Sequence, residues 1–233
     1  MKECRSTNAL MVEKLSAPLP EGTVLITSCQ TAGQGQRGSS WEAEPDKNLT
    51  FSLLLKPSFL PISDQFYLNM VICLAISDTL TQYTSKKVTI KWPNDIYVEA
   101  KKICGILINN FLKGCQFEHV VVGIGLNVNQ ENFQEPKAVS LKMIEQKEVN
   151  LVEVLEILLG NIEKWYLALM QKKYKNIQEN YLSKMFRINE KHLYRSDGIF
   201  EGTIRGIDPT GKLAVETEVG IRYFCLKEIE YVM

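Results

Sequence analysis

The chain has 233 residues, with 27 Lys+Arg against 27 Asp+Glu and a formal net charge of zero. This length allows one large domain, or one domain with a small appendage, and 45% hydrophobic residues are typical of a globular protein. The balanced charge argues against a protein that wraps nucleic acid, for which a basic excess is expected.

The cysteines and the N-terminal segment indicate a cytoplasmic protein. The six cysteines are scattered and form no CxxC pair, which favours a reducing compartment. Lys2 and Glu3 follow Met1 and lead into a polar segment, so no signal peptide is expected. The most apolar stretch, residues 67–76, is too short to span a bilayer. We therefore expect a protein that binds neither membranes nor nucleic acid.

The first part of the chain predicts a helix, two strands and a long polar loop. Ser6 is a candidate N-cap for a helix over residues 7–15. Residues 23–28 and 49–56 are β-branched or alternating runs, which predict strands. Residues 29–48 between them are polar and rich in glycine, and a loop of this length in a compact domain is usually functional or disordered.

The rest of the chain predicts one helix, three strands and a pair of helices, in this order: residues 64–83, 88–92, 103–109, 118–124 and 151–185. From Lys191 the sequence changes to short strands and glycine-rich turns, which predicts a small β-barrel or sandwich. The boundary is expected near residues 186–190. The order of these elements favours an α+β fold, with helices and strands ahead of a small β-domain.

Residues 33–38 (GQGQRG) match the pattern GxGxxG of dinucleotide-binding turns. That pattern requires a helix directly after the glycines, but Pro45 and the lack of apolar periodicity in residues 39–46 exclude one. No lysine follows the last glycine as in a Walker loop, and no HRD or DFG triplet is present as in a kinase. Taken alone, the segment is as consistent with a flexible surface hairpin as with a binding site.

Arg37 and Trp41 beside these glycines favour a binding site. Glycines let backbone N–H groups approach an anion, an arginine matches a phosphate, and a tryptophan offers a stacking face. Residues 91–95 (KWPND) and 101–107 (KKICGIL) are, taken alone, more often a turn and a solvated lysine pair than a site. Residues 121–129 (VVGIGLNVN) form either a strand ending in an asparagine-rich turn or a strand that a ligand approaches closely.

Together, the segments QTAGQGQRGSSW, KWPND, KKICGIL and GIGLNV, in this order and at these separations, resemble the biotin–protein ligase family. The resemblance covers residues 6–130 by motif and begins with Ser-Thr-Asn at residues 6–8. Residues 202–211 resemble, more weakly, the SH3-like C-terminal module of this family. The resemblance implies a catalytic biotin- and adenylate-binding domain over residues 1–187, built on a mixed β-sheet with flanking helices, and an SH3-like β-barrel over residues 188–233.

The activity that the resemblance implies is that of a biotin–[acetyl-CoA-carboxylase] ligase. Such an enzyme converts biotin and ATP into biotinyl-5'-AMP and transfers the biotin to a lysine of a biotin carboxyl carrier protein. Mg²⁺ is expected to accompany the ATP, with its ligands left open. The resemblance is compatible with a monomer or a homodimer.

The resemblance also assigns roles to residues. The residues expected to bind biotin are Ser6, Thr7, Gln30, Gly33, Gln34, Gly35, Gln36, Lys102 and Gly105. Those expected to bind the nucleotide are Arg37, Trp41, Asn94 and Asn127, and the expected catalytic residues are Lys102, Arg37 and Asp95. The chemistry fits this set, because a carboxylate and a phosphate must meet and therefore need fixed cations. The adenylate hydrolyses readily, so the loop over residues 29–48 is expected to close over it and exclude water.

The sequence departs from the family in the glycine-rich loop. The usual Gly-Arg-Gly-Arg is replaced here, with Gln34 and Gln36 in place of both arginines and Arg37 remaining. Charge-assisted hydrogen bonds are about twice as strong as neutral ones, so Arg37 is expected to retain the adenylate.

Three alternatives remain open. The first is a lipoate–protein ligase or octanoyltransferase of the same broad fold, against which KWPND and the glycine-rich loop argue. The second is a biotin-sensing DNA-binding regulator, which would carry a helix-turn-helix domain before Ser6, where five residues stand. The third is a non-catalytic binding module, against which the presence of Lys102, Asp95 and Asn127 argues.

Overall fold

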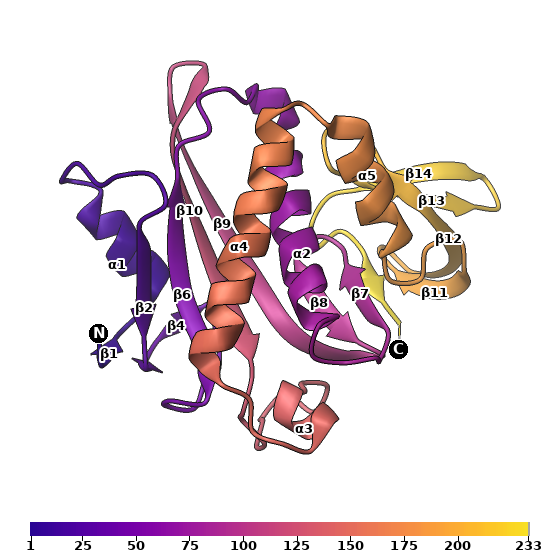
Figure 1. Cartoon of the computed structure of the whole chain (residues 1–233). Helices are drawn as coiled ribbons and strands as arrows, with labels where there is room; N and C mark the ends of the chain where they lie inside the picture. Colours follow the sequence, from indigo (N-terminus) through magenta and orange to yellow (C-terminus); the bar gives the residue numbers. More distant parts are fainter. Residues whose placement is uncertain (233) are drawn as a thin grey trace.

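A six-stranded sheet, in the order β2-β6-β10-β9-β8-β7, forms the centre of the larger part of the chain (Figure 1). The computed structural model describes residues 1–232, and for Arg37 it describes the backbone but not the side chain. The strands of the sheet are β2 (Val24–Thr27), β6 (Asn48–Leu55), β7 (Val88–Lys91), β8 (Asp95–Val98), β9 (Lys101–Lys113) and β10 (Gln116–Asn127). The strands expected over residues 23–28, 49–56, 88–92, 103–109 and 118–124 are thereby confirmed.

The sheet is antiparallel at every strand pair among the described residues, and not mixed as we expected. Strands β7 to β10 follow one another through short turns, which make antiparallel neighbours. The helical crossover α2 (Phe66–Leu80) joins β6 to β7, but β10, β9 and β8 lie between these two strands. Among the named strands, parallel pairing occurs between β1 (Glu3–Cys4) and β3 (Cys29–Gln30), outside this sheet.

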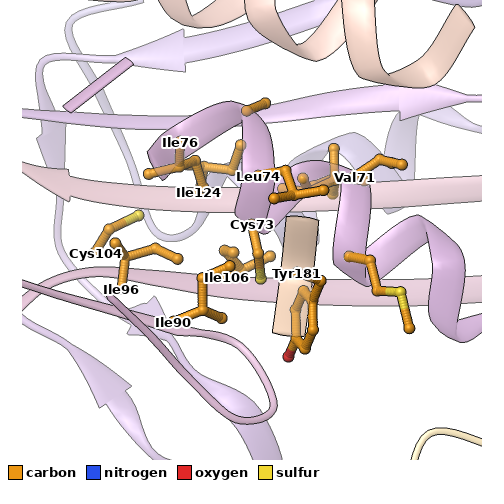
Figure 2. Packing of buried hydrophobic residues seen from close by; sticks show 14 of the residues in the cluster. Val71, Cys73, Leu74, Ile76, Ile90, Ile96, Cys104, Ile106, Ile124 and Tyr181 are labelled. Carbon is orange, nitrogen blue, oxygen red and sulfur yellow. The ribbon is translucent and has the colours of Figure 1, made fainter. Parts of the chain in front are cut away.

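The two faces of the sheet differ because side chains alternate along each strand. Odd-numbered residues of β6 and the even-numbered residues 120–126 of β10 are apolar and pack under α2 and α4 (Leu151–Met170) in the main core. Figure 2 shows Ile106 of β9 and Ile124 of β10 in this core beside side chains of α2. Each such buried side chain stabilises the fold by roughly 1.5–3 kcal/mol. The opposite face carries small and polar residues of the same strands, including Thr50, Ser52 and Gly123.

Helix α1 (Thr7–Lys14) packs on that opposite face. Ser6 is its N-cap, as expected, because the Ser6 hydroxyl accepts a hydrogen bond from the Ala9 amide at 3.4 Å. Met11 packs with Leu54 and Val121 in a second, smaller apolar cluster. The helix therefore brings residues 6–8 onto the polar part of the sheet.

Three further helices complete this part of the chain. The pair expected over residues 151–185 is confirmed as α4 and α5 (Tyr174–Ser183). The short α3 (Leu141–Glu145), capped by Ser140, was not expected. Two 3₁₀ turns, η1 (Gln36–Gly38) and η2 (Ile62–Asp64), precede α2. No helix within the described residues is both long and apolar enough to cross a bilayer.

A five-stranded antiparallel sheet follows, in the order β14-β13-β12-β11-β15. Its strands are β11 (Lys191–Arg195), β12 (Ile199–Ile207), β13 (Leu213–Thr217), β14 (Gly220–Phe224) and β15 (Glu230–Tyr231). The edge strands β14 and β15 do not pair with each other in the described part of the chain, so no closed barrel forms. The sheet contacts the larger one where the Trp92 indole donates a hydrogen bond to the Gly211 carbonyl at 2.9 Å.

Candidate active site

Two cavities adjoin on the polar face of the larger sheet. The smaller has a volume of about 210 Å³ and lies between α1, the glycine-rich segment and strands β9 and β10. The larger, of about 650 Å³, lies between Trp41, β7, β8 and residues 133–138. Both are lined by Ser39, Ser40, Trp41, Asp95 and Lys102. These shared residues form the boundary across which groups bound in the two cavities could react.

The floor of the site is built from glycines on neighbouring strands. Gly105 of β9 and Gly125 of β10 are paired in register, and the Trp41 ring lies over both. A Cβ atom at Gly105 would lie 3.0 Å from the ring, and one at Gly125 would overlap it. The ring can occupy this place only because both positions lack a side chain.

The glycine-rich segment is ordered into two short strands and a turn, β4 (Gly33–Gln34), η1 and β5 (Ser40–Trp41). Gly33 pairs with Trp41, and a Cβ atom at Gly33 would overlap the Trp41 carbonyl oxygen. The segment is therefore a small hairpin that holds the tryptophan over the glycine floor. The first glycine of the GxGxxG pattern serves this close pairing.

Polar side chains from α1 and β3 form one end of the smaller cavity. The side-chain oxygen (Oε1) of Gln30 accepts hydrogen bonds from the Thr7 backbone N–H at 2.8 Å and from the Thr7 hydroxyl at 3.2 Å. The side-chain oxygen (Oδ1) of Asn8 accepts a hydrogen bond from the side-chain nitrogen (Nδ2) of Asn109 at 2.9 Å. The Asn8 side-chain nitrogen and the Gln36 side-chain oxygen are buried without a partner among the described residues. A buried polar atom without a partner costs roughly 1–3 kcal/mol, so the cavity favours a ligand with both a donor and an acceptor.

An ion pair marks the junction of the cavities. The Lys102 ammonium lies 2.7 Å from an Asp95 carboxylate oxygen and 5.7 Å from the centre of the Trp41 ring. The side chains of Lys102 and Asp95 are 30% and 24% exposed, so both remain accessible to a ligand. Asp95 stands at the start of β8, directly after the cis peptide bond between Trp92 and Pro93 and the residue Asn94.

The larger cavity combines a buried side-chain amide with charged residues. Asn127 is buried, and its amide nitrogen donates to the Val139 carbonyl at 3.1 Å, while its amide oxygen has no partner within the described structure. The Trp41 indole nitrogen is also buried and unpartnered among these residues. Further lining residues that the sequence did not single out are Glu42, Lys91, Tyr97, Glu135, Lys137 and Tyr231. For Lys91 a signal existed, because it is the first residue of KWPND.

The structure brings most of the expected site residues together at the two cavities. Eight of the nine expected biotin-binding residues line the smaller cavity: Ser6, Thr7, Gln30, Gln34, Gly35, Gln36, Lys102 and Gly105. Gly33 does not line it but pairs with Trp41 behind it. Asn94, expected at the nucleotide, lines the smaller cavity and donates its amide to the Ile106 carbonyl. Asn127 lines the larger cavity, and the side chain of Arg37 lies outside the described residues.

The chain is similar in sequence and in fold to proteins of known activity. Residues 2–127 match the model of the Biotin/lipoate A/B protein ligase family, and residues 193–227 match the Biotin protein ligase C terminal domain. The chain is 30% identical to a biotin–[acetyl-CoA-carboxylase] ligase of Paracoccus denitrificans over 92% of both chains. It is 29% identical to the bifunctional ligase/repressor BirA of Bacillus spizizenii, over 97% of this chain and 71% of that protein. The biotin protein ligase of Aquifex aeolicus in complex with biotin and ATP superposes with a TM-score of 0.84, at 29% identity, over 100% of this chain and 97% of that one.

Proposed function

The chain belongs to the biotin/lipoate A/B protein ligase family, and on that basis we propose that it is a biotin–protein ligase. It activates biotin with ATP to biotinyl-5'-AMP and transfers the biotin to a lysine of a biotin carboxyl carrier domain. The observation that carries this proposal is the Lys102–Asp95 ion pair at the boundary of two cavities of different chemistry.

The smaller cavity suits biotin better than lipoate. The ureido group of biotin has two N–H donors and a carbonyl acceptor, which match the unpartnered Gln36 oxygen and Asn8 nitrogen. A dithiolane ring offers neither a comparable donor nor a comparable acceptor, and would leave these buried atoms without partners. Gly105 and Gly125 line this cavity without side chains, and the Trp41 ring that lies over them forms part of its wall.

The larger cavity suits ATP. The Asn127 amide oxygen can accept from an adenine amino group, and the Trp41 ring offers a face for the base. Lysines 91, 102 and 137 line the same cavity and can receive phosphates.

The first step joins the contents of the two cavities. A biotin carboxylate oxygen attacks the α-phosphorus of ATP, forming the acyl phosphate bond, and pyrophosphate leaves with the electrons of the broken P–O bond. Both reactants are anions, so a fixed cation at their meeting point lowers the barrier. Lys102 lines both cavities and fits this role. Asp95, paired with it, holds the ammonium in place.

The residues of the larger cavity fit a Mg²⁺ ion that arrives with ATP. Glu42, Asp95 and Glu135 line this cavity, although no group of three His, Cys, Asp or Glu residues within the described chain is arranged to hold a metal. Mg²⁺ in nucleotide sites is usually bound by one or two carboxylates together with substrate phosphates. When bound, it would neutralise part of the phosphate charge.

In the second step a neutral lysine amine of the carrier attacks the acyl carbon, and AMP leaves. The amine must lose a proton, and the Asp95 carboxylate at the cavity boundary is placed to accept or orient it. The hairpin of β4, η1 and β5 covers the boundary and limits hydrolysis of the adenylate. We also propose that residues 1–187 form the catalytic domain and that residues 188–233 form an SH3-like module.

The proposal is tested by biotin-dependent exchange of labelled pyrophosphate into ATP. With the purified chain, exchange is expected with biotin and not with lipoate or octanoate. Exchange with lipoate alone would place the chain in the lipoate branch of the family. Exchange with none of the three acids would overturn the proposed activation step.

Loss of the Arg37 charge is expected to release the adenylate. Arg37→Gly should allow biotinyl-AMP to escape and label lysines of a bystander protein, because a charge-assisted bond is about twice as strong as a neutral one. Gln36→Gly should leak far less, since Gln36 lines the smaller cavity through an uncharged side chain. Streptavidin blotting of a non-acceptor protein measures the leak. Strong labelling by Gln36→Gly with none by Arg37→Gly would assign retention to the loop position that the family normally uses.

A further inference from the structure

We propose that Lys91 binds the two phosphates of ATP that leave as pyrophosphate, and that Tyr231 of the C-terminal sheet fixes Lys91 in that position. The proposal rests on the proposed function and gives one of the three lysines of the larger cavity a specific part in it. It also gives the C-terminal sheet a part in the first half-reaction.

The surroundings of Lys91 are those of a cation held for a ligand. Its ammonium donates to the Tyr97 hydroxyl at 3.1 Å and lies 5.1 Å from the centre of the Tyr97 ring and 5.0 Å from that of Tyr231. No carboxylate of the described residues lies within ion-pair distance of it, whereas the neighbouring Lys102 is paired with Asp95. Two aromatic faces partly compensate the loss of water but supply no countercharge.

The charge of Lys91 is therefore only partly compensated. Burial lowers the pKa of the Lys91 ammonium, Asp95 raises it, and the nearby charges of Lys102 and Lys137 lower it further. An anion that carries more than one charge would stabilise the charged form of a half-buried ammonium that has other cations nearby. The other carboxylates of this cavity, Glu42 and Glu135, are exposed and each accepts a hydrogen bond from a backbone amide.

Lys91 and Lys102 differ in which of the two cavities they line, and this indicates different roles. Lys102 lines both cavities, so it can contact the biotin carboxylate and the α-phosphate together. Lys91 lines the larger cavity and not the smaller one, so it is available only to the nucleotide. With the adenine on Asn127 and Trp41 and the α-phosphate at Lys102, the remaining anionic groups of ATP are its β- and γ-phosphates.

Tyr231 connects this lysine to the C-terminal sheet. It lies in β15, which pairs with β11 at Tyr194, and its ring packs edge-on against that of Tyr194 at 5.4 Å. The Phe186 ring lies 5.5 Å from that of Tyr97 and 6.2 Å from that of Tyr231. The aromatic group around Lys91 is thus assembled from both sheets and the segment between them.

The test separates the two half-reactions, because only the first involves the β- and γ-phosphates. Lys91→Met should lower kcat/KM for ATP, and for pyrophosphate in the reverse reaction, about 10- to 100-fold. Transfer from synthetic biotinyl-5'-AMP to a carrier domain should stay within about twofold of the unsubstituted chain. Lys91→Arg should recover part of the lost activity, since it keeps the charge. Lys113→Met, at an exposed lysine on the end of β9, is the matched control and should change neither reaction.

For Tyr231, the variant Tyr231→Leu should raise KM for ATP while sparing transfer from biotinyl-5'-AMP. Tyr223→Leu, at a tyrosine of β14 that is 54% exposed, is its control. Equal losses in both half-reactions for Lys91→Met and Lys91→Gln would show a purely structural role and overturn the proposal, as would unchanged ATP kinetics. Failure of the proposed function is a different result, because the unsubstituted chain would then show no biotin-dependent exchange.

Discussion

Replacing Lys102 with alanine is expected to slow the formation of biotinyl-5'-AMP about 100- to 1,000-fold, the usual effect of removing one preorganised group that faces a developing charge. The ammonium stands at the boundary of the two cavities, 2.7 Å from the Asp95 carboxylate. Its loss removes the cation between two anionic reactants and also leaves Asp95 there unneutralised, which repels both of them. The measurement is the turnover number of biotin-dependent pyrophosphate exchange.

The stability of Lys102→Ala and a neighbouring control variant separate a catalytic role from a structural one. The fold should persist, because the side chains of this ion pair are 30% and 24% exposed and such pairs contribute roughly 0–1 kcal/mol to stability. Lys101→Ala changes the exposed neighbouring lysine and should leave exchange unaffected. A Lys102→Ala chain with an unchanged turnover number and an unchanged melting temperature would remove Lys102 from the catalytic residues.

Adding a single methyl group at Gly125 is expected to weaken the binding of ATP. In Gly125→Ala the new Cβ atom would overlap the Trp41 ring, so the ring must leave its place over β9 and β10. Stacking of a base on an aromatic ring contributes roughly 1–3 kcal/mol, so affinity for ATP should fall about 5- to 150-fold. Equilibrium binding, to the biotin-bound chain, of an ATP analogue whose α–β bridging oxygen is replaced by a methylene group, and which therefore cannot release pyrophosphate, measures this loss.

The matched control is Gly160→Ala, at a glycine of α4 with no atom within 4 Å of the added methyl group. It should bind ATP normally and raise the free energy of unfolding by about 0.5–1 kcal/mol, because alanine loses less backbone entropy in a helix. If Gly125→Ala bound ATP as well as Gly160→Ala does, the Trp41 ring would not be the surface on which the nucleotide rests.

The sequence predicted those elements whose signals are local. The N-cap at Ser6 and the alternation of β6 identify α1 and β6 from a few neighbouring residues, and both are confirmed. The antiparallel pairing throughout the larger sheet was not predicted. It depends on where α2 delivers the chain after β6: β7 lies three strands away from β6, and the strands between them, β8, β9 and β10, come later in the sequence. Asp95 was expected in a turn after Pro93, and it is also the first residue of β8.

For the site, the expected motifs converge, but the contacts between them were not predictable. Gly33, Gly105 and Gly125 are each compatible with an ordinary turn or strand, and their common reason is the Trp41 segment, which packs against all three. Lys91 at the end of an alternating strand is typical of a solvated side chain. The Lys91 side chain is buried by Tyr97 and by Tyr231, which lies 140 positions later in the sequence. No local sequence pattern indicates a contact over such a separation.

The glycine floor also limits which biotin analogues the pocket can be engineered to accept. Gly105, Gly123 and Gly125 line the smaller cavity and have no side chain to shorten, so no substitution at these positions can make the pocket deeper. Room for a bulkier analogue has to come from the walls, where Leu107 and Leu226 also line the cavity. A biotin analogue enlarged on the side that faces the sheet is therefore expected to be rejected by every variant that keeps the strands intact. An analogue enlarged toward Leu107 can be accommodated by replacing that leucine with a smaller residue.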